Sequence, residues 1–138
     1  MKGSRIRRAL ASLALALVVA LALVGTALAH DVTFDTDLSL HRSPGGTVAS
    51  GTQITFSGAL SSSKAACERN SRIDLIKVGS GVVERTRTGA QGGYSFQRKV
   101  YQTQNWRTRF RGKVLSAVHP HNHVCGASVS RTIQVPVG

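Results

Sequence analysis

The fold is decided by one stretch, Trp106-Arg107-Thr108-Arg109-Phe110-Arg111-Gly112, in which uncharged residues alternate with arginines. Successive side chains of a β-strand point to opposite faces of the sheet. The stretch therefore predicts a strand with one face in the core and the other in solvent, ended by Gly112. The core face carries Trp106, Thr108 and Phe110, and the solvent face carries Arg107, Arg109 and Arg111.

Outward from this strand, short alternating runs are separated by turn residues, which is typical of all-β proteins. Two packed antiparallel sheets are the economical way to bury such positions. We therefore predict one all-β domain over residues 30–138, a single seven-stranded antiparallel β-sandwich. A polar loop is expected at 61–70 and a longer loop at 114–126. The other six strands are expected near 32–40, 53–58, 73–75, 82–88, 94–96 and 129–137.

Five stretches resemble motifs of known domains, and three of them are later strands: Ile73-Asp74-Leu75, Trp106 to Gly112 and Ser128 to Val137. Gly51-Thr52-Gln53-Ile54-Thr55-Phe56-Ser57-Gly58 is similar to the opening strand of bacterial immunoglobulin-like domains. Thr88-Gly89-Ala90-Gln91-Gly92-Gly93-Tyr94-Ser95-Phe96 resembles their hairpin, which also occurs in transthyretin-like and carboxypeptidase-regulatory-like domains. The resemblance implies an immunoglobulin-like or prealbumin-like β-sandwich, a surface location and no enzymatic activity. This chain departs from the pattern as a lone domain with two cysteines.

Residues 1–29 have the order of parts of a cleavable signal peptide. Lys2, Arg5, Arg7 and Arg8 precede an uncharged apolar run over 9–24, and Ala27-Leu28-Ala29 supplies the small-residue cleavage pattern. The alternative is an uncleaved membrane anchor, although the run is shorter than the roughly 20 residues that a spanning helix needs. Cleavage would lower the formal net charge from +12 to +8, because four of the 18 basic residues and no acidic residue are removed.

The two cysteines, Cys67 and Cys125, are an even number in a chain expected to be exported. Disulfides form and persist in oxidising compartments outside the cytoplasm. We predict one bridge between them, in a protein that is secreted, extracellular or associated with the cell envelope. Metal ligation and free thiols are the competing interpretations, and no Cys-x-x-Cys spacing favours the former.

Basic residues suggest a binding surface. A cationic exported domain is drawn to anionic surfaces, so the expected partner is an anionic envelope or matrix component, or another secreted protein. The alternative is that these residues only solvate exposed strands. Specific nucleic-acid binding is not expected, because the aromatic residues are predicted in the core, and membrane contact is expected only through the signal peptide. The predicted surface consists of Arg85, Arg87, Arg98, Lys99, Arg107, Arg109 and Arg111.

Histidines form the second unusual pattern. His119, His121 and His123 alternate within 119–123, so an extended segment would place them on one face. Imidazole suits Cu²⁺ and Zn²⁺. Cleavage after Ala29 would add His30, with a free amino group, as a fourth ligand, whereas cleavage after Ala27 would not.

Enzyme motifs are missing. There is no Gly-x-Ser-x-Gly nucleophile turn and no glycine-rich phosphate loop that opens a helix. We therefore expect a non-enzymatic exported binding domain without a cofactor. The alternative is an exported copper- or zinc-binding protein that uses the histidines.

Overall fold

The computed structural model describes residues 30–118 and 121–138. Within them the chain forms twelve strands in three sheets and one short helix, which confirms the all-β class. The predicted signal peptide, 1–29, and His119 lie outside the described residues. No helix in the described ranges is long and apolar enough to cross a membrane.

The first sheet is built around β4 (Thr52–Ser62), the strand of the immunoglobulin-like opening motif. β7 (Gly93–Val100) and β3 (His41–Ser43) both pair with residues 55–57 of β4, so they lie along its opposite edges. β2 (Thr36–Leu38) pairs with the end of β4. All of these pairs are antiparallel.

The second sheet contains the stretch that decides the fold. β5 (Arg72–Lys77) lies between β6 (Gly81–Arg87) and β8 (Gln104–Phe110), and all pairs are antiparallel. The short strands β11 (Ser128–Val129) and β12 (Ile133–Val135) pair with the other edge of β8.

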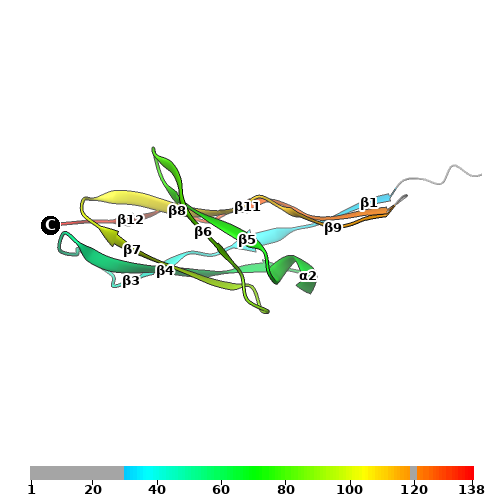
Figure 1. Cartoon of the computed structure of the whole chain (residues 1–138), viewed down its shortest axis with the longest axis horizontal. Coiled ribbons are helices and arrows are strands. Elements are labelled where there is room, and N and C mark those ends of the chain that lie inside the picture. The colour runs from blue at the N-terminus through cyan, green and yellow to red at the C-terminus, as the bar shows by residue number, and fades with distance from the viewer. Residues whose placement is uncertain (1–29, 119–120) are drawn as a thin grey trace, which may run out of the picture.

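These two sheets pack face to face and enclose the core, as their separation into two layers shows (Figure 1). Phe56 of the first sheet and Trp106 of the second meet with ring centroids 5.0 Å apart. The alternation of β8 predicts its core face correctly, because Trp106, Thr108 and Phe110 are all buried. Burial of each large apolar side chain contributes about 1.5–3 kcal/mol.

The third sheet lies beyond the two layers, at the end opposite the C-terminus (Figure 1). It consists of β1 (His30–Phe34), β10 (His121–Cys125) and β9 (Lys113–Val118), in the order β1-β10-β9. The predicted loop at 114–126 is therefore wrong. The described residues also differ from the expected sandwich in having three sheets, more than seven strands and a parallel pair, β1 with β10. The polar, proline-containing sequence suggests a loop, but backbone pairing with β1 organises it as strands.

The hairpin motif places its glycine for a steric reason. Gly92 has φ of 83°, and a Cβ atom there would lie 2.1 Å from the carbonyl oxygen of Leu60. Only glycine permits this approach between the turn and β4. The same motif then delivers Tyr94, whose hydroxyl group donates to the carbonyl of Ser39 and lies 2.8 Å from Oγ1 of Thr108. Burial raises the pKa of Tyr94 to about 12. The tyrosine thereby joins the two layers of the sandwich.

The predicted disulfide is present. Cys67 lies in α2 (Ala65–Glu68), a helical turn within the segment expected to be a polar loop, and Cys125 ends β10. Both cysteines are buried, and the bridge joins residues 58 positions apart. It fastens the third sheet to the segment that follows β4.

Candidate functional site

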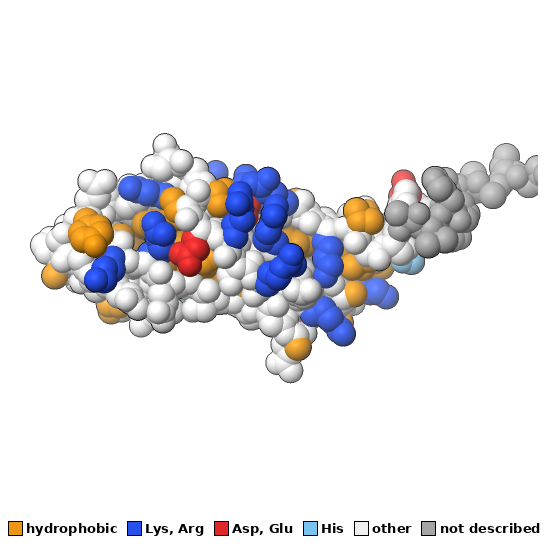
Figure 2. All heavy atoms as spheres, viewed as in Figure 1, with side chains coloured by type: hydrophobic (Ala, Val, Ile, Leu, Met, Phe, Trp, Pro, Cys, Tyr) orange, Lys and Arg blue, Asp and Glu red, His pale blue; other side chains and the backbone are white. Residues whose placement is uncertain are grey.

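Six arginines share the outer face of the second sheet. Cross-strand partners project to the same face of an antiparallel sheet, and the register pairs Arg72 with Arg87 and Asp74 with both Arg85 and Arg109. A dense basic patch covers this part of the molecule (Figure 2). Among the described residues of β5, β6 and β8, the acidic ones are Asp74 and Glu84, and Glu84 alternates with Arg85 and lies 3.8 Å from Arg98 of β7. We call the set the arginine face: Arg72, Arg85, Arg87, Arg107, Arg109 and Arg111.

Asp74 is the anchor of the arginine face. Its carboxylate Oδ2 accepts hydrogen bonds from Nε of Arg111 at 2.8 Å and from Nη2 of Arg109 at 3.2 Å. Nε of Arg85 lies 3.3 Å from Oδ1, which is an ion-pair distance, but Oδ1 has no partner with hydrogen-bond geometry. One carboxylate from the middle strand therefore organises arginines from both neighbouring strands.

The arginines cover Asp74 completely. The side chain of Asp74 is 1% exposed, whereas those of Arg85, Arg109 and Arg111 are 55%, 35% and 51% exposed. Burial alone would raise the pKa of Asp74, but the hydrogen bonds and charges of Arg111 and Arg109 outweigh it, so the pKa lies below the ordinary value. The carboxylate stays ionised, and the three partly exposed guanidinium groups have more donors than Asp74 uses, although Nε of Arg109 is buried.

A second row of arginines lies beside the arginines that surround Asp74, and this row contains no acidic residue. Arg72 stands directly opposite Arg87, and the adjacent Ile73–Phe110 pair places Arg72 beside Arg111 on the other neighbouring strand. A depression of about 280 Å³ opens here, and no carboxylate lines it. Its lining residues are Asn70, Ser71, Arg72, Arg87, Phe110, Arg111, Gly112 and Lys113.

Two residues of the predicted basic surface lie elsewhere. Arg98 and Lys99 belong to β7 in the first sheet, and Arg98 lies 3.8 Å from Glu84. Both line a separate depression of about 250 Å³ together with Lys77, Tyr101 and Trp106. The structure thus brings Arg85, Arg87, Arg107, Arg109 and Arg111 together and leaves Arg98 and Lys99 apart from them.

Three residues of this site were not part of the basic surface predicted from the sequence, namely Arg72, Asp74 and Lys113. Arg72 and Asp74 alternate with the core residues Ile73 and Leu75, so their outward direction was readable from β5 alone. Lys113 was not readable in this way, because it reaches the depression from the start of β9.

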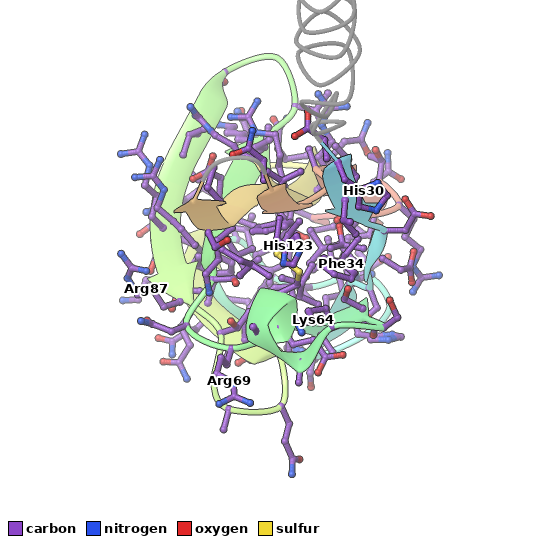
Figure 3. The ribbon with its side chains drawn as sticks, turned by 90° about the vertical axis from the view of Figure 1, so that its right-hand side faces the viewer. His30, Phe34, Lys64, Arg69, Arg87 and His123 are labelled. Atoms are coloured by element: carbon purple, nitrogen blue, oxygen red, sulfur yellow. A yellow bond between two sulfur atoms is a disulfide. The ribbon has the colours of Figure 1, made fainter. Side chains whose placement is uncertain are left out.

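The structure describes some of the histidines of the predicted metal site. The parallel pairing sets the Cα atom of His30 opposite that of His121, and His123 follows two residues along β10. The ring of His123 meets Phe34 edge to face at 5.9 Å, and both lie near the disulfide (Figure 3). In the part of the chain that the structure describes, no three His, Cys, Asp or Glu side chains gather as a metal site. His119 lies outside that part.

The chain was compared with known proteins. No family model, no curated protein and no solved structure matches it. The likeness to immunoglobulin-like and transthyretin-like domains therefore rests on the sequence motifs and the all-β fold. Function has to be inferred from the arginine face and the histidines.

Proposed function

We propose that this protein is an exported, non-enzymatic binding domain of immunoglobulin-like or transthyretin-like type. It attaches to an anionic polymer of the cell envelope or the surrounding matrix through the arginine face. The observation that carries the proposal is the imbalance of charge on that face, where six arginines accompany one buried carboxylate that pairs with three of them. Guanidinium forks match phosphate and carboxylate groups, so the unused donors suit a polymer that repeats such groups.

Two further observations support export and the class of partner. The Cys67–Cys125 disulfide is consistent with an oxidising location. The aromatic residues of the strands that carry the arginine face, Trp106 and Phe110, are buried in the core, so the described outer face lacks the stacking platform typical of single-stranded nucleic-acid sites. The disulfide thus supports export, and the missing stacking platform favours attachment by charge alone.

The arginine face can be tested without disturbing the cluster around Asp74. Arg72, Arg87 and Arg107 make no contact with Asp74, so changing all three to Ser leaves that cluster intact. We expect the triple variant of residues 30–138 to bind immobilised polyphosphate about tenfold more weakly at physiological salt, at about 0.5 kcal/mol per exposed charge. Binding is measured by surface plasmon resonance over a series of salt concentrations.

The matched control removes three cations from other faces. Lys64, Lys77 and Lys99 changed to Ser lower the net charge by the same amount, and we expect their loss to have a much smaller effect. Equal weakening in both variants would show that only total charge matters. Absence of binding by the unchanged protein to both polyphosphate and polyglutamate would contradict the proposed function.

A second candidate function is copper or zinc binding, and the β1–β10 register is the observation that favours it. That register brings the backbone of His30 beside that of His121, with His123 two residues away. If cleavage after Ala29 makes His30 the first residue, its free amino group would join this juxtaposition of histidines. Imidazole and amine nitrogens are suitable ligands for Cu²⁺.

The metal candidate predicts that residues 30–138, starting at His30, bind Cu²⁺ with a Kd below about 10 µM in calorimetry. One extra glycine before His30, or the change His121→Ala, should weaken binding. His41→Ala is the control, since His41 lies in β3 of another sheet. Weak binding by the unchanged protein, or binding that the extra glycine does not alter, would rule out this site.

A further inference from the structure

The arginine face contains two neighbouring rows that differ in one residue type. In the first row, Arg85, Asp74 and Arg109 stand side by side on β6, β5 and β8. In the second row, two residues along the strands and therefore about 6.6 Å away, Arg87, Arg72 and Arg111 occupy the equivalent positions. The middle position is an acid in the first row and an arginine in the second.

The second row is electrostatically incomplete. Like charges directly opposite each other on a sheet destabilise it, and Arg72 has a like charge on both sides. Among the described residues, the carboxylate that pairs with this face is that of Asp74, and Arg85, Arg109 and Arg111 already share it. A bound anion would neutralise the arginines of the second row, as Asp74 neutralises those of the first.

Neighbouring carbonyl groups hold the cations around this row in place. Arg87 donates from Nη1 to the carbonyl of Asn70 at 3.0 Å. Lys113 donates from Nζ to the carbonyls of Ala66 and Arg69 at 3.0 and 2.9 Å. In Figure 3, the side chains of Arg87 and Arg69 project outward from the molecule. A guanidinium group has five N–H donors, so Arg87 and Arg111 keep most of theirs for a ligand.

We infer that the depression between Arg72, Arg87 and Arg111 binds one phosphate group of the polymer, an inference that rests on the proposed function. Its volume of about 280 Å³ leaves room for such a group. Phosphate presents oxygens in several directions and can so accept from arginines on three strands at once. A terminal phosphate group of such a polymer, like inorganic phosphate, also carries more than one negative charge near neutral pH, whereas a carboxylate carries one.

The test is a titration of residues 30–138 with inorganic phosphate and, separately, with acetate at constant ionic strength, followed by NMR of the arginine side-chain signals. We expect saturable shifts for Arg72, Arg87 and Arg111 below about 20 mM phosphate. Acetate should bind about tenfold more weakly. Shifts that spread over all surface cations without saturation, or equal binding of acetate, would overturn the phosphate assignment.

The decisive variant is Arg72→Asp, which converts the second row into a copy of the first. We expect it to abolish the phosphate-dependent shifts and to raise the thermal midpoint of unfolding. Arg107→Asp makes the same change in charge on the same face but outside the depression, and it should keep phosphate binding. Arg72→Ser, which removes the charge without adding an acid, should weaken phosphate binding and so tests the site even if Arg72→Asp fails to fold.

The outcomes separate this inference from the proposed function. If polyphosphate binds the unchanged protein and Arg72→Asp and Arg107→Asp lower phosphate binding equally, the phosphate pocket is wrong and the general attachment by charge stands. If neither polyphosphate nor polyglutamate binds, the proposed function is wrong as well.

Discussion

Changing both Cys67 and Cys125 to Ala is expected to lower the free energy of unfolding by about 4 kcal/mol. The bridge joins residues 58 positions apart, and the entropy of closing a loop of that size in the unfolded chain gives this value. A loss of this size is a large fraction of the 5–15 kcal/mol that is typical of whole domains. Urea denaturation followed by fluorescence measures it, because Trp106 is the only tryptophan and is buried.

The disulfide variant should also lose stability unevenly. Because Cys125 ends β10 and Cys67 lies next to the first sheet, the bridge fastens the third sheet to the sandwich. Hydrogen exchange should therefore accelerate most in β9 and β10, and least in β4 and β8. Uniform acceleration, or a loss below about 1 kcal/mol, would contradict the role that we assign to the bridge.

The second large effect is expected for Asp74→Asn, which should cost about 3 kcal/mol. Removing one partner of a buried ion pair costs about 3–5 kcal/mol, and the lower end applies because the arginines are partly exposed and can recover water. The change keeps the shape of the side chain, so the loss reports the charge. Urea denaturation at neutral pH measures it, with Asp37→Asn as a control because Asp37 is exposed. A variant at least as stable as the unchanged protein would contradict the anchoring role.

The ionisation of Asp74 also makes the free energy of unfolding depend on pH in the acid range. Because the pKa of Asp74 in the folded protein lies below its ordinary value of 3.8, the carboxylate stabilises the fold fully above that value. The contribution declines as the pH falls through the lower pKa of the folded state. Asp74→Asn should lack this part of the acid dependence, which a comparison of denaturation curves between pH 2 and pH 6 will show.

Local alternation predicted the sheet interior and the outward arginines, since both depend on neighbours in sequence. The alternation at 106–111 placed Trp106 inside and Arg109 outside, and the even number of cysteines predicted the bridge. The third sheet was missed because β1 pairs with residues roughly 90 positions later in the chain. Nothing in the sequence around His30 specifies that partner.

The candidate site was likewise predictable only where it depends on neighbours in sequence. Five arginines of the arginine face were expected, but the burial of Asp74 beneath them depends on the register of three strands. A register is fixed by turns and by packing of the core face, so the arrangement of Arg85, Asp74 and Arg109 in one row required the structure.

The parallel pairing of β1 with β10 has a consequence for the order of folding. The ribosome releases β1 long before β10, so the first strand has no partner until nearly the whole domain has been synthesised. Contacts between distant parts of a chain form slowly. We therefore expect the sandwich around β4 and β8 to assemble before β1 docks on β10. Until β1 docks, we expect the edge of β10 that it covers to stay open to solvent.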